Sequence, residues 1–183
     1  MKIALYSDLH LETMRNFPAL AAVPRPVNGA DLIILAGDIH QGTQGLQALA
    51  DLQEADHIYV AGNHEYYHHD IEILDDHLFE LAAQKKLNYL QRTSAVIQGV
   101  RFLGCTLWTD FNIQPGWRFG AELVAKAFLP DYKLIRLRGK QFTPSMGIEL
   151  HRQNIDWLES ALAVPFDGKT VVVTHHAPHP QSI

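Results

Sequence analysis

Short apolar runs rich in β-branched residues recur along the chain, and such runs are typical of buried strands. We expect strands at six of them, two of which flank Gln98-Gly99 and form a hairpin with a tight turn. The runs are Lys2–Ser7, Asp31–Ala36, His57–Val60, Thr93–Ile97, Val100–Cys105 and Thr170–Thr174.

Other segments carry apolar residues at helical spacing. The predicted helices are Gly42–Glu54, Ile71–Leu87, Glu122–Leu129 and Ser145–Ala163. Pro18, Pro24 and Pro26 mark a loop-rich connection, and Leu107–Gly120 has an irregular, aromatic pattern. Because strands alternate with helices in the first half and a hairpin lies in the middle, we expect an α/β or α+β layered domain with a mixed sheet.

Composition narrows the class of protein. The 183 residues are enough for a single domain with a real core. A formal net charge of -5 argues against nucleic acid and anionic membranes as partners. One cysteine permits no internal disulfide, and no stretch is long and apolar enough to span a membrane, so we expect a cytoplasmic protein. The unusual count is histidine, with 11 residues.

Polar clusters follow four of the predicted strands. They read Ser7-Asp8-Leu9-His10, Gly37-Asp38-Ile39-His40, Gly62-Asn63-His64-Glu65 and His175-His176-Ala177-Pro178. Sites in open α/β sheets form at the carboxyl ends of strands, so these clusters can converge. In an extended chain, the spacing of Asp8 and His10 places both on one face. Mixed oxygen and nitrogen ligands suit Mn, Fe, Zn, Co or Ni.

Each cluster alone has an ordinary explanation. A Gly-Asp pair is usually a turn, Asn63 can satisfy its own backbone, and His175 can be a hydrogen-bonded core histidine. Four such clusters in order, each at the exit of a predicted strand, are hard to obtain by chance. We therefore interpret the set as one metal site.

The motifs D-x-H, G-D and G-N-H-E, followed by a strand that ends in H-x-x-P, resemble those of the calcineurin-like metallophosphoesterases. The resemblance runs from Met1 to the end of the chain. It implies a β-sandwich of two mixed sheets flanked by helices, with two divalent metal ions at the strand exits. It also implies hydrolysis of a phosphomonoester or phosphodiester, on a small phosphorylated substrate, through a metal-bridging hydroxide.

The resemblance also implies roles for individual residues. Asp8 and His10 would hold the first metal, Asp38 would bridge both metals, and Asn63 and His175 would hold the second. His175 is chosen over His176 because the first histidine of the pair matches the ligand position of the family. The catalytic residue would be His64, which contacts the phosphate and stabilises charge or protonates the leaving oxygen.

Four further residues receive weaker assignments. Glu65 would orient His64 or its neighbours, although a solvated loop carboxylate is an equal alternative. His40 and His176 could face the substrate. Trp108, in the segment after the hairpin, could form a substrate wall, but we favour aromatic core packing.

The sequence departs from the family pattern in one respect. The downstream motif G-H-x-H, whose histidines complete the two metal shells, does not occur in the chain. We expect a single domain over residues 1–183 that lacks its C-terminal strands because the gene product is longer. Two alternatives are ligands supplied by a partner subunit, and weak metal binding with loss of catalysis.

A second class of function uses the same fold without catalysis. A scaffold or interaction protein on this fold would be expected to have lost metal ligands or the phosphate-facing histidine. Because the chain retains Asp8, His10, Asp38, Asn63, His64 and His175, we favour the enzyme.

Overall fold

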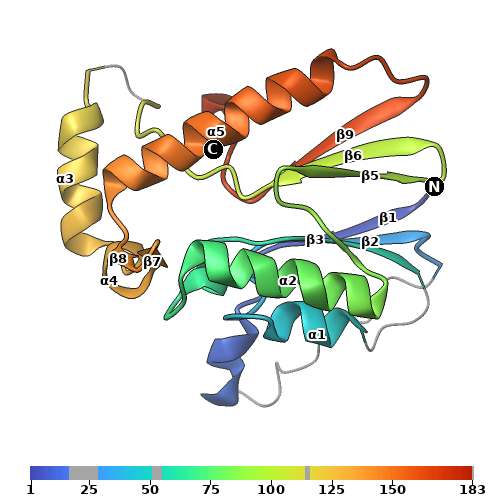
Figure 1. Cartoon of the computed structure of the whole chain (residues 1–183), viewed down its shortest axis with the longest axis horizontal. Helices are drawn as coiled ribbons and strands as arrows, with labels where there is room; N and C mark the ends of the chain where they lie inside the picture. Colours follow the sequence, from blue (N-terminus) through green and yellow to red (C-terminus); the bar gives the residue numbers. More distant parts are fainter. Residues whose placement is uncertain (17–28, 51–54, 114–115, 183) are drawn as a thin grey trace.

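Two larger β-sheets with helices on their outer faces, and a small two-stranded sheet, make up the described part of the computed structural model, as Figure 1 shows. The structure describes residues 1–16, 29–50, 55–113 and 116–182, so the predicted loop with Pro18, Pro24 and Pro26 lies largely outside it. This is the expected α/β sandwich class. The first sheet is parallel throughout its described strands, and the second is mixed.

The first sheet has the strand order β1-β2-β3-β4. Its strands are β1 Ile3–Tyr6, β2 Leu32–Ala36, β3 Asp56–Val60 and β4 Asn88–Tyr89. Helices α1 (Gln44–Ala50) and α2 (Ile71–Lys85) cover its outer face (Figure 1). β2 is buried along its whole length because apolar layers pack on both of its faces.

The second sheet has the order β5-β6-β9, with β5 and β6 antiparallel and β6 and β9 parallel. Its strands are β5 Thr93–Ile97, β6 Val100–Cys105 and β9 Lys169–Thr174. Helix α5 (Pro144–Ala163) lies over its outer face, where Leu158 packs with Leu103 and Cys105. The predicted hairpin around Gln98-Gly99 is therefore confirmed.

A layer of apolar side chains lies between the two sheets. Side chains from both sheets meet there; the buried members are Leu32, Ile34, Ala36, Ile58, Val60, Leu90, Ile97, Phe102 and Val173. Burial of such side chains stabilises the fold by roughly 1.5–3 kcal/mol each relative to full exposure. Because β1, β2, β3 and β9 run the same way through this sandwich, their carboxyl ends lie at one edge.

The remaining elements differ most from the sequence-based expectation. Helix α3 spans Arg118–Phe128, so it begins within the segment expected to be irregular. The short elements α4 (Asp131–Leu134), β7 (Arg136–Leu137) and β8 (Lys140–Gln141) were not predicted. They are too short to show a recognisable period, and they pack beside α3 and the start of α5 (Figure 1).

A buried carboxylate fastens α2 to the segment that follows β3. Oδ1 of Asp75 accepts hydrogen bonds from the hydroxyls of Tyr66 (2.7 Å) and Tyr89 (2.6 Å). Burial raises the pKa of Asp75 from 3.8 to about 6, even though both tyrosine hydroxyls oppose that rise. Tyr66 follows Glu65 directly, so this carboxylate helps to position the G-N-H-E segment.

The raised pKa of Asp75 makes stability depend on pH. The folded state binds the proton more tightly than the unfolded state, so the contribution of Asp75 to stability is present below pH 3.8 and lost as the pH rises through about 6. We expect Asp75→Asn, which keeps the accepting oxygen, to be more stable than wild type at pH 7 by up to about 3 kcal/mol. The gain should shrink towards pH 4, as measured by urea unfolding at both values. If Asp75→Asn raised the free energy of unfolding by the same amount at both pH values, this account would be contradicted.

Candidate metal centre

The four polar clusters meet at the edge of the sheets where the strands end. Beyond the last paired residues of β1 and β2, the two chains continue to hydrogen-bond. The N–H of Asp8 donates to the carbonyl of Gly37 at 3.0 Å, and the N–H of His10 donates to the carbonyl of Asp38 at 3.0 Å. Asp8 and His10 are thereby held beside Asp38.

The backbone at these positions is left-handed. The φ angles are 56° at Asp8, 46° at His10 and 56° at Asp38. The expectation that Asp8 and His10 share a face of an extended chain is therefore wrong, although the His10 Nε2 to Asp8 Oδ1 distance is only 4.0 Å. Left-handed backbone is uncommon in residues other than glycine, and such strain concentrates at functional sites.

Asp38 lies between two groups of possible metal ligands. One group contains His10, Asp38 and His64, and the other contains Asp8, Asp38 and His175. Oδ2 of Asp38 is 3.9 Å from Nε2 of His10 and 3.8 Å from Nε2 of His64. Its Oδ1 is 3.4 Å from Nε2 of His175. One carboxylate thus presents a different oxygen to each group, an arrangement that allows it to bridge two ions.

The surroundings of His175 fit a bound cation. Nδ1 of this ring lies 3.0 Å from the carbonyl of Ala36, which can only accept, so the neutral ring carries its proton there. Nε2 is then an acceptor, yet it faces two further acceptors, Oδ1 of Asn63 at 3.2 Å and Oδ1 of Asp38. A divalent cation would satisfy all three acceptor atoms at once.

The amide of Asn63 is oriented by a residue that the sequence does not reveal. Oδ1 of Asp131 accepts from Nδ2 of Asn63 at 3.0 Å and from the hydroxyl of Tyr67 at 2.8 Å. This leaves the carbonyl oxygen of Asn63 pointing towards His175. Asp131 lies 68 residues further along the chain and belongs to no recognisable motif, so no local signal could have found it.

Glu65 is fully buried beneath the loop that carries Asp38. Its carboxylate accepts from the backbone N–H groups of Asp38 (3.0 Å), Ile39 (2.8 Å) and Gly62 (2.7 Å) and from the hydroxyl of Tyr59 (2.8 Å). Burial, and then the nearby charge of Asp38, raise the pKa of Glu65. Glu65 was expected to orient His64 or its neighbours. Among the described residues, its hydrogen bonds hold the loop that carries Asp38, and none of them reaches the ring of His64.

The backbone of the G-N-H-E segment is also held by Asp38. The N–H of His64 donates to Oδ1 of Asp38 at 2.9 Å, and the ring of His64 stacks on Tyr67 with 4.2 Å between centroids. The side chain of His64 is 26% exposed, so it faces the opening of the site. A reacting group bound at Asp38 would lie within its reach.

His40 and His176 lie outside both ligand groups. Nδ1 of His40 is 3.2 Å from the carbonyl of Gln41. Nδ1 of His176 is 3.1 Å from the carbonyl of Thr106, and burial together with the neighbouring His175 lowers the pKa of His176 to about 4. Contact of either residue with a substrate remains a prediction.

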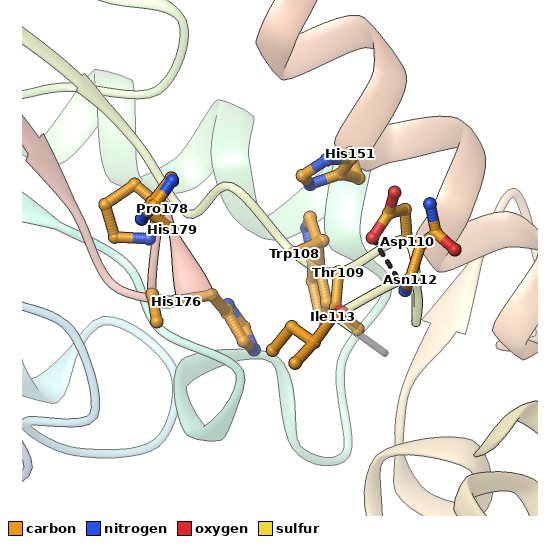
Figure 2. A pocket seen from close by; sticks show the side chains of 10 residues that line it. Trp108, Thr109, Asp110, Asn112, Ile113, His151, His176, Pro178 and His179 are labelled. Atoms are coloured by element: carbon orange, nitrogen blue, oxygen red, sulfur yellow. Dashed lines mark hydrogen bonds between the residues drawn. The ribbon is translucent and has the colours of Figure 1, made fainter. Parts of the chain in front are cut away.

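A cavity of about 460 Å³ opens beside His176, as Figure 2 shows. Trp108 forms part of its wall and stacks on His176, with 5.5 Å between the ring centroids. Trp108 is 4% exposed and also packs against Phe142, which agrees with the preferred core-packing interpretation. The ring of His176 contacts that of His175, so the cavity begins one side chain away from the candidate metal ligands.

The whole sequence, residues 1–183, matches the family model of calcineurin-like phosphoesterases, and the chain belongs to that family. Its members are metal-dependent phosphoesterases that usually bind two divalent metals, in agreement with the two ligand groups around Asp38. No curated protein shows a significant match to the chain. Within the described residues, the helices are all too short or too polar to cross a membrane.

Gly62 leaves room for two of the candidate ligands. A Cβ atom at this position would lie 2.2 Å from Oδ1 of Asp38 and 2.9 Å from Cδ2 of His175. We expect Gly62→Ala to displace both side chains and to weaken Mn binding by about 10–100-fold, the usual effect of disturbing the support of a metal ligand. Isothermal titration with Mn measures the change.

Gly120→Ala is the matched control, because a Cβ atom there would meet nothing closer than 3.9 Å. It should leave the Mn affinity unchanged. Equal affinities in wild type, Gly62→Ala and Gly120→Ala would show that Asp38 and His175 do not bind the same metal centre.

Proposed function

We propose that this chain is a hydrolase that cleaves a phosphomonoester or phosphodiester of small size with the help of two divalent ions. The observation that carries the proposal is the position of Asp38, whose two carboxylate oxygens face two separate groups of ligands. The resemblance pairs Asp8 with His10, whereas the distances favour Asp8 with His175 in one group and His10 in the other, with Asn63 beside His175. Oxygen and imidazole ligands favour Mn, Fe, Zn, Co or Ni.

Two divalent cations in such a site supply positive charge to the phosphoryl oxygens and lower the pKa of water. The residues of the chain orient the phosphate and stabilise or protonate the leaving group. Asp38 is fixed by the N–H of His64 and by Glu65 below its backbone, so the ligands are organised before substrate binds. Such preorganisation lowers the barrier because few groups must reorient during the reaction.

His64 is the residue that we assign to the leaving group. Its ring stacks on Tyr67, its Nε2 lies 3.8 Å from Oδ2 of Asp38, and a quarter of its side chain is open to solvent. From this position the imidazole can donate a proton to the departing oxygen or stabilise the charge that develops on it.

The leaving group would extend towards the cavity beside His176 and Trp108, because His176, which lines this cavity, contacts the ring of His175. The negative net charge of the chain supports a small substrate over a nucleic acid. A non-catalytic scaffold would need neither the shared carboxylate nor the oriented imidazole and amide. The lone cysteine, Cys105, is buried and agrees with a cytoplasmic setting.

Removal of the His64 imidazole tests the proposal. With Mn bound, wild type should hydrolyse p-nitrophenyl phosphate or its bis ester, and His64→Ala should lower kcat by about 10²–10⁴-fold, the usual contribution of a general acid. The Mn content after loading and desalting, measured by elemental analysis, should stay at about two ions per chain in both proteins.

Two results would contradict these assignments. Wild type that binds Mn but hydrolyses neither ester would exclude the proposed activity on these model substrates and would favour the scaffold. Loss of one Mn ion in His64→Ala would show that His64 is a ligand of the metal and not the residue that faces the leaving group.

A further inference from the structure

A carboxylate outside the expected ligand set lies against two of the site histidines. Glu12 belongs to the short 3-10 helix η1 (Leu11–Asn16), which follows His10. Its side chain is 11% exposed, which is low for a glutamate on a short surface helix. A carboxylate loses much of its hydration at such a position, so its partners must compensate.

The partners of Glu12 are both imidazoles. Its Oε1 lies 3.0 Å from Nδ1 of His64 and 3.4 Å from Nδ1 of His10. The two rings meet edge to face with 4.4 Å between their centroids. Oε1 of Glu12 thus contacts both rings at Nδ1, on the side of each ring that faces away from Asp38.

The opposite ring nitrogens point towards the centre. Nε2 of His64 and Nε2 of His10 lie 3.8 Å and 3.9 Å from the same oxygen of Asp38. Each imidazole therefore spans the gap between two carboxylates, Glu12 at Nδ1 and Asp38 at Nε2. A carboxylate that accepts the Nδ1–H fixes both the tautomer and the orientation of a neutral imidazole.

The second oxygen of Glu12 is enclosed as well. Oε2 is buried and has no hydrogen-bond partner among the described residues. Leaving such an oxygen without a partner costs about 1–3 kcal/mol or more for a charged group. A residue that only filled space here would be more stable as an apolar side chain.

We propose that Glu12 is a positioning residue, which holds His64 and His10 with the proton on Nδ1 and Nε2 turned to the metal centre. The proposal concerns the orientation of the two rings and stands without catalysis; its kinetic consequence rests on the proposed function. In His10, Nε2 is then free to bind a cation. In His64, Nε2 faces the leaving group; when the ring is protonated on both nitrogens, Glu12 keeps the proton on Nδ1 and the proton on Nε2 passes to the departing oxygen.

The tautomers can be measured directly on the metal-free protein. In long-range ¹H–¹⁵N spectra of protein labelled with ¹⁵N-histidine, His64 and His10 should show the Nδ1–H form at a pH where both rings are neutral. The variants His64→Ala and His10→Ala assign the signals. Glu12→Ala should shift both rings towards the Nε2–H form, which free imidazole side chains prefer, whereas Glu12→Gln, which retains an accepting oxygen, should preserve the Nδ1–H form in His64.

Kinetics with Mn test the consequence. Glu12→Ala should lower kcat by about 10–100-fold with little change in KM. The loss should be larger for phenyl phosphate than for p-nitrophenyl phosphate, because a poorer leaving group depends more on the proton from His64. Glu12→Gln should recover most of the activity. Glu80→Ala, which removes an exposed carboxylate of α2, is the control and should match wild type.

The two measurements separate the two proposals. Unchanged His64 and His10 tautomers in Glu12→Ala would overturn the positioning role, whatever the activity. A wild type that lacks Mn-dependent hydrolysis would overturn the proposed function alone, because the spectra of the metal-free protein still decide the role of Glu12. An equal loss of kcat for both aryl phosphates would overturn the claim that Glu12 acts through the proton on His64.

Discussion

The buried carboxylate of Glu65 joins the ends of two neighbouring strands, and the geometry of the site depends on this joint. Glu65 follows β3, but most of its backbone donors belong to the loop after β2. Without it, the N–H groups of Asp38, Ile39 and Gly62 would be buried with no acceptor, at a cost of about 1–3 kcal/mol each. Glu65 therefore fixes the backbone of Asp38, which has a left-handed conformation. The side chain of Asp38 can then face two ligand groups.

The positions of the strand ends could be predicted from the sequence. Each strand shows as a short apolar run, and parallel strands in any sheet end at the same edge. A run such as Leu32–Ala36 can only be a strand buried on both faces, and parallel strands deliver their carboxyl ends to one edge of a sheet. From those two facts alone, Asp8, Asp38 and His175 were expected to meet, and the structure brings them together. The hairpin followed from the two apolar runs around Gln98-Gly99, whereas the sandwich of two sheets was implied by the resemblance to the family.

The supporting residues could not be predicted, for physical reasons. Asp131 reaches Asn63 from a short helix that has no periodic pattern, and the contact exists only after the sheets and α5 have packed. Glu12 stands two residues after His10 but belongs to none of the motifs, and its role depends on His64, which lies 52 residues away. The left-handed turns at Asp8 and His10 also escaped prediction, because neither residue follows a glycine.

The position of His175 has a consequence for the cohesion of the whole domain. Asp8, His10, Asp38 and Asn63 follow strands of the first sheet, whereas His175 follows β9 of the second. A cation held by both sets would act as a cross-link between the two halves of the sandwich, in addition to the apolar core and to hydrogen bonds such as that from Thr106 to the carbonyl of Ala61. Any ligand that binds only the folded state stabilises it in proportion to the logarithm of its concentration. Separation of the sheets and release of the ion would then be a single cooperative event, and a chelator would act on this protein as a mild denaturant.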